Sequence, residues 1–62
     1  MNRVDVYPYE SSGYIAVAEM AVTMWARGAT IDEAIAEYKK NYRGIIEMFG
    51  PFEWDFHVKL KG

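Results

Sequence analysis

A glycine followed by a helix-start signal constrains the fold of this chain more than any other feature. In the segment Gly28-Ala29-Thr30-Ile31-Asp32-Glu33-Ala34, a threonine precedes a glutamate by three residues. This spacing predicts a capping box, with Thr30 as the N-cap and Glu33 closing the first turn. Asp32 and Glu33 also lie where the positive end of the helix dipole favours carboxylates. We therefore expect a strand to end at residues 28–29 and a helix to begin directly afterwards.

One apolar stripe follows along the predicted helix. Its members recur at helical spacing, and they are Ile31, Ala34, Ile35, Tyr38, Tyr42, Ile45 and Phe49. Gly44 weakens the middle of the helix by about 1 kcal/mol relative to alanine. Gly50 suits the position just after the last turn, and Pro51 prevents continuation. The pattern predicts a single long helix that ends near residue 49.

Alternation of apolar and polar residues predicts strands on both sides of this helix. Residues 52–60 alternate most clearly, with aromatic and aliphatic side chains on one face and charged side chains on the other. Residues 3–9 alternate as well, with Pro8 near the strand end because proline cannot donate to a ladder. Residues 14–20 are largely apolar on both faces, which indicates a central strand covered on both sides.

The stretch between the second strand and the helix carries a weaker signal. We place a turn over residues 19–22 and a third strand over residues 23–27, although no strong turn residue lies in residues 20–26. One long strand with a bulge is the alternative. The order β-β-β-α-β predicts an α+β fold in one domain, residues 1–62: an antiparallel sheet with one long helix packed on one face.

Composition indicates that this domain associates with another chain. Among 62 residues, 52% are hydrophobic and none is cysteine, so no disulfide compensates for a small core. We expect a homo-oligomer, a dimer or a tetramer.

The charge balance and the distribution of apolar residues indicate whether the chain binds nucleic acids or membranes. The net charge is −2 and the basic residues are scattered, so we expect no direct binding of nucleic acid. No apolar run is long enough to span a membrane, and residues 2–5 do not lead into a signal peptide. We expect a cytoplasmic protein that does not bind membranes.

Few residues in the sequence indicate chemistry. Glu53, Asp55 and His57 alternate on one strand face and are weak candidates for a metal site, because no second motif completes the ligand set. A solvated edge of the sheet explains these three residues more simply. We expect no catalytic residues, no cofactor and no enzyme activity.

Three aromatic residues point instead to contact with a protein. Tyr7, Tyr9 and Trp25 are candidate anchors for a partner, because tyrosine and tryptophan are enriched among interface hot spots. A platform that stacks nucleobases would also need a basic groove, which the charge distribution lacks.

Two segments of the chain resemble the small domain of HicB-like antitoxins. The first is Gly13-Tyr14-Ile15-Ala16, and the second contains Gly28, Thr30, Asp32, Glu33 and Ala34. The preceding Tyr7-Pro8-Tyr9 also fits, and the resemblance covers roughly residues 3–49. It implies a β-β-β-α-β domain that masks a small ribonuclease toxin by steric occlusion, with no chemistry of its own.

The chain departs from this family at two places. The family often has a Pro-Gly-Cys-like segment where this chain has Ala21-Val22-Thr23-Met24. Family members usually carry a DNA-binding domain after the sheet domain, and this sequence ends at Gly62, so DNA binding is not expected. Two alternatives are a homo-oligomeric protein that binds a small molecule or a metal, and an enzyme related to the ribonuclease H architecture.

Overall fold

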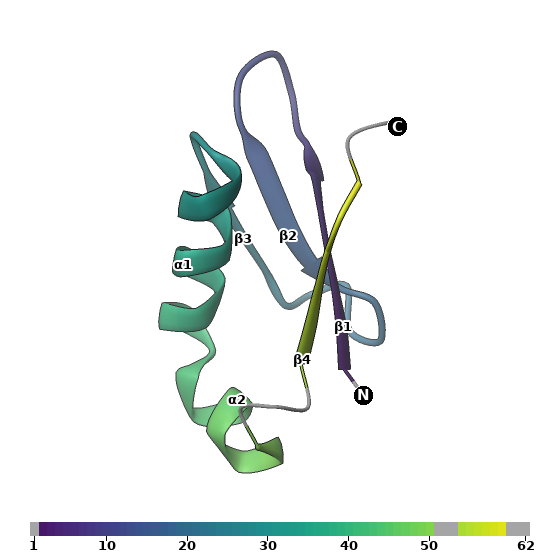
Figure 1. Ribbon diagram of the computed structural model, residues 1–62, viewed down its shortest axis with the longest axis vertical. Helices are drawn as coiled ribbons and strands as arrows, with labels where there is room; N and C mark the ends of the chain where they lie inside the picture. Colours follow the sequence, from purple (N-terminus) through teal and green to yellow (C-terminus); the bar gives the residue numbers. More distant parts are fainter. Residues whose placement is uncertain (1, 51–53, 60–62) are drawn as a thin grey trace.

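Within the residues that the structure describes, the protein has an α+β fold in which two helices pack against a four-stranded sheet (Figure 1). The computed structural model describes residues 2–50 and 54–59. The elements in chain order are β1 (Asn2–Pro8), β2 (Tyr14–Ala18), β3 (Trp25–Gly28), α1 (Ile31–Asn41), α2 (Arg43–Phe49) and β4 (Trp54–Val58). The first two strands match the predicted ranges closely.

The sheet is mixed, so the prediction of an antiparallel sheet is wrong for one pair of strands. The strand order is β3-β2-β1-β4, with β1–β2 and β2–β3 antiparallel and β1–β4 parallel. Two reversals between β1 and β3 leave β3 running in the direction of β1. The helical connection then returns the chain to the starting end, so β4 also runs in that direction.

The prediction of one long helix is also wrong, because the helix breaks at Tyr42. This residue has φ −118° and ψ 29°, outside the helical region. Its hydroxyl accepts from the backbone N–H of Trp25 at 3.1 Å and donates to the carbonyl of Trp25 at 3.2 Å. Tyr42 is therefore held against the sheet by a tertiary contact that the apolar spacing of the helix does not encode.

The third strand begins two residues later than predicted. A turn over Ala21–Met24 is closed by the N–H of Met24 donating to the carbonyl of Ala21 at 2.8 Å. The N–H of Ala18 donates to Met24 at 3.0 Å and joins the end of β2 to the start of β3. The hairpin with one connecting turn is thus observed, and the alternative of one bulged strand is not.

The predicted capping box is present at the start of α1. The N–H of Glu33 donates to Thr30 Oγ1 at 3.1 Å. The Glu33 carboxylate accepts from the N–H of Ala29 at 2.9 Å, one residue before the cap. The two bonds satisfy backbone donors that a helix start would otherwise leave open.

The core lies between α1 and one face of the sheet. Its buried members are Val4, Val6, Ala16, Ala18, Ala26, Ala34 and Tyr38. Trp54 and Phe56 of β4 pack against this cluster, which confirms the predicted facing of the last strand. Phe49, the last residue of the predicted helical stripe, is 57% exposed.

Small residues allow the helix to lie close to the sheet. A Cβ added at Gly28 would lie 2.6 Å from the carbonyl carbon of Glu33 and would also overlap the backbone of Ala34. Gly44 is different, because a Cβ there would meet nothing within 4 Å. The first glycine permits contact between two elements, whereas the second only weakens a helix.

Alanine substitutions at these two glycines should have opposite effects. Gly28→Ala should lower the free energy of unfolding by about 1–3 kcal/mol, because the backbone of α1 must move to accommodate the methyl group. Gly44→Ala should raise it by up to about 1 kcal/mol through helix propensity. Urea denaturation of both variants measures the difference, and equal effects would contradict the close approach at Gly28.

Tyr38 is the centre of an aromatic cluster beneath β4. Its ring centroid lies 4.8 Å from that of Tyr42, 5.8 Å from Phe56 and 6.3 Å from Trp54. The side chain is fully buried, and no described residue forms a hydrogen bond with its hydroxyl. Burial, with a contribution from Tyr42, raises the pKa of this phenol. The ring stabilises the core while the unpaired hydroxyl opposes it.

Substitution of Tyr38 should separate these two contributions. Tyr38→Phe should raise the free energy of unfolding by about 1 kcal/mol, because it removes a buried polar group without a partner. Tyr38→Ala should lower it by about 3–5 kcal/mol through loss of the ring. Thermal and urea denaturation give both values. A destabilised phenylalanine variant would show that the hydroxyl has a partner.

Candidate interaction surface

The face of the sheet opposite the helices is an open surface. Side chains that alternate with the core residues point to this face, and no described helix or strand packs on it. The strand register places Asp55 beside Arg3, and it aligns His57, Asp5, Val17 and Trp25 in the next row. A third row contains Tyr7, Ile15 and Arg27. The face therefore divides into a charged half over β4 and the first part of β1, and an aromatic half over β2, β3 and the end of β1.

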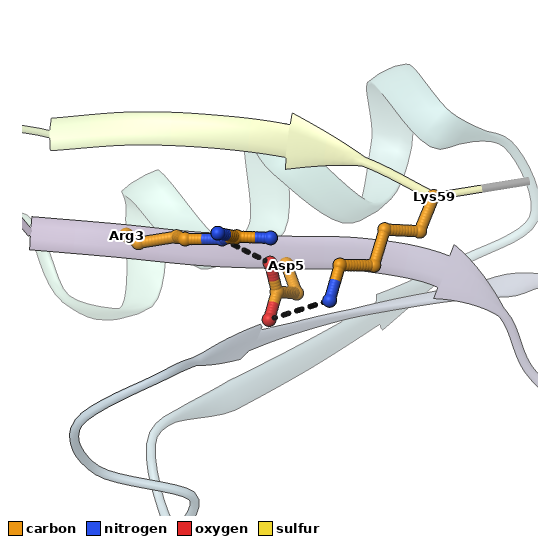
Figure 2. A network of polar contacts seen from close by, with 3 residues as sticks. All are labelled: Arg3, Asp5 and Lys59. Carbon is orange, nitrogen blue, oxygen red and sulfur yellow. Dashed lines mark hydrogen bonds and ion pairs between the residues drawn. The ribbon is translucent and has the colours of Figure 1, made fainter.

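Asp5 is the centre of the charged half, which we define as Arg3, Asp5, Asp55, His57 and Lys59. Figure 2 shows its carboxylate between two basic side chains. Arg3 Nε donates to Asp5 Oδ1 at 2.8 Å, and Lys59 Nζ lies 3.5 Å from Asp5 Oδ2. The Asp5 side chain is only 17% exposed. The network therefore joins β1 to the residue that follows β4.

The two basic residues change the titration of Asp5. Its partial burial acts to raise the pKa, but the Arg3 hydrogen bond and the charges of Arg3 and Lys59 outweigh burial and lower the pKa below 3.8. The hydrogen bond to Asp5 in turn raises the pKa of Arg3. A carboxyl group with a lowered pKa in the folded state stabilises that state while it is ionised.

The stability contributed by Asp5 should disappear in acid. The unfolded chain binds a proton at this carboxyl more readily than the folded chain, so stability is lost as the pH falls below about 4. The groups that face Asp5 are Arg3, Lys59 and, in register on β4, His57. Thermal melts of wild type and Asp5→Asn should differ at pH 7 and converge towards pH 2. A difference that is the same at both pH values would contradict this assignment.

The aromatic half consists of Tyr7, Tyr9, Ile15, Val17, Trp25 and Arg27. The Arg27 guanidinium lies 5.6 Å from the centroid of the Tyr9 ring and 5.9 Å from that of the Trp25 ring. These distances allow cation–π attraction to both rings. Arg27 Nη1 also lies 3.8 Å from Glu10 Oε1. The arginine thereby brings together two of the three predicted anchors.

The exposure of these side chains suits contact with a partner. Trp25 is 46% exposed and Tyr9 is 38% exposed, while Tyr7 is partly buried beside Ile15. Tyr9 and Arg27 also line a hollow of about 300 Å³ where the β1–β2 turn meets the end of β3. Arg27 was not among the predicted residues, although its position two residues after Trp25 places both on one strand face.

The structure describes two of the three weak candidates for a metal site. Asp55 and His57 are exposed on the charged half, and Glu53 lies outside the described residues. Residues 2–50 and 54–59 contain no group of three side chains suited to hold a metal ion. These two candidates are therefore exposed polar side chains on the edge strand of the sheet.

Comparisons of the chain with protein-family models, with curated proteins and with solved structures found no match. Within the described residues, neither helix has the length and apolarity needed to cross a membrane.

Proposed function

We propose that this chain is a HicB-like, antitoxin-type protein that acts by protein–protein contact and masks a small ribonuclease toxin in the cytoplasm. The observation that carries the proposal is the aromatic half of the open sheet face. It joins Tyr9 and Trp25 through Arg27, on a face that no other described element covers. The resemblance of two short segments to HicB-like antitoxins directs the proposal to a toxin.

The residue types of the aromatic half support a protein partner. Tyrosine, tryptophan and arginine are the side chains most enriched among interface hot spots, where they are surrounded by contacts that exclude water. Here they lie beside the apolar residues Ile15 and Val17, which a partner would cover further. Occlusion requires only such a surface, so the chain performs no chemistry in this mechanism.

The charge of the chain supports the class of partner. A ribonuclease needs a basic surface to hold the phosphates of its RNA. A chain with net charge −2 is attracted to such a surface, and complementary charge accelerates encounter. The acidic balance that disfavours nucleic acid as a partner thus favours a protein that binds nucleic acid.

Inhibition of a captured ribonuclease tests the proposal. The tagged chain should co-purify from its host with a small basic protein, identified by mass spectrometry, that cleaves RNA when purified alone. Addition of the wild-type chain should stop cleavage. Trp25→Ala should weaken the complex by at least about 2 kcal/mol, or about thirtyfold in Kd.

A matched variant on the opposite face provides the control. Lys40 is exposed on α1, so Lys40→Ala should leave inhibition unchanged. Far-ultraviolet circular dichroism should show that both variants are folded. A captured protein without ribonuclease activity would contradict the toxin, and equal inhibition by Trp25→Ala and wild type would contradict the binding face.

A further inference from the structure

The two edges of the sheet differ in whether another strand can pair with them. At the β3 edge, the Tyr42 hydroxyl bonds with both the N–H and the carbonyl of Trp25. These backbone groups point away from β2, because Met24 and Ala26 are the residues that face it. The side chain of Tyr42 thus occupies groups that an incoming strand would need, and α1 lies beside the same edge (Figure 1).

Among the described residues, the β4 edge presents a row of backbone groups that have no bonding partner. The N–H of Lys59 donates to the carbonyl of Val6 at 2.7 Å, so Lys59 faces β1. Because backbone direction alternates along a strand, Trp54, Phe56 and Val58 direct their N–H and carbonyl groups outward. Within residues 2–50 and 54–59, no other group bonds with them. Such an edge is a template for an added strand.

Apolar side chains accompany this edge on the helix side. Val58 is 39% exposed, and Trp54 and Phe56 are only partly buried. A hollow of about 490 Å³ lies between Trp54, Phe56 and the helices. Lys39 covers part of the Phe56 ring at 5.2 Å. A strand added here would therefore bury aromatic surface as well as backbone groups.

We propose that β4 pairs with β4 of a second copy of the chain, antiparallel and centred on Phe56. In this register Phe56 faces itself across the two-fold axis, and Trp54 faces Val58 of the second copy. All three are residues with outward backbone groups, so they form the bonded pairs that an antiparallel ladder requires. The two sheets become one continuous sheet.

Side-chain complementarity on the other face favours a second copy in this register. Asp55 precedes Phe56 by one residue, and His57 follows it by one residue. Antiparallel pairing about Phe56 therefore places Asp55 of each copy opposite His57 of the other. There the Asp55 carboxylate can accept a hydrogen bond from the His57 imidazole N–H, whereas a parallel, in-register pair would set the two Asp55 carboxylates against each other.

The difference between the edges also limits the assembly to two copies. Pairing of β4 with β4 is isologous, so it uses both free edges at once. The remaining outer edges are the two β3 strands, each blocked at Trp25 by Tyr42. The assembly closes as a dimer and leaves the aromatic half of each open face uncovered. This inference is independent of the proposed function.

Sedimentation equilibrium and single-cysteine variants test the dimer and its register. The wild-type chain at micromolar concentration should have twice the chain mass, and a monomer would overturn the proposal. The chain has no cysteine of its own, so Asp55→Cys and His57→Cys each introduce one defined thiol. Both positions are exposed, so these variants should fold.

The register is measured by mixing the two variants under mild oxidation. The mixture should give about tenfold more disulfide-linked dimer than either variant alone, because only directly opposed residues have Cα atoms within bridging distance. A mixture of Glu37→Cys, exposed on α1, with His57→Cys is the control and should give no excess. Equal cross-linking in all samples would overturn the register.

Discussion

The first turn of α1 lies directly against the backbone of β3, and the rest of the fold depends on this contact. Gly28 permits it, because any Cβ there would overlap the backbone of Glu33 and Ala34. The capping box then holds the turn, with Glu33 bonded to both Thr30 and Ala29. A helix that begins directly after the end of β3 and is held there must cross the sheet on one face. That path buries Tyr38 and leaves the other face uncovered.

This arrangement gives the small domain two surfaces with different physical character. The open face offers side chains: a charged half around Asp5 and an aromatic half around Arg27. The β4 edge offers backbone groups, which pair by geometry with little regard to side-chain identity. A partner on the face and a second copy on the edge can therefore bind at the same time. Tyr42 contributes to this division by holding the β3 edge closed.

Much of the local structure follows from residues close together in the sequence. The capping box, the end of β3 at Gly28 and the strand faces of β1 and β4 all rest on spacing within a few residues. The start of the third strand is harder to predict, because no glycine or proline marks the turn over Ala21–Met24. Alternation also places Asp55 and His57 on one face of β4. It did not show which residues of other strands lie beside them.

The element types, the helix start and the facing of the strands follow from the order of the amino acids, because they depend on periodicity and on caps. Contacts between distant residues establish that β4 lies parallel to β1, that the helix breaks at Tyr42 and that Arg27 lies near both Tyr9 and Trp25. Each of these outcomes joins residues far apart in the chain. The sequence shows the same stripe of apolar residues at helical spacing whether or not one of its tyrosines forms hydrogen bonds with the backbone of an edge strand. Strand alternation is likewise the same in parallel and antiparallel pairs, so pairing direction is set by how the connecting helix crosses the sheet.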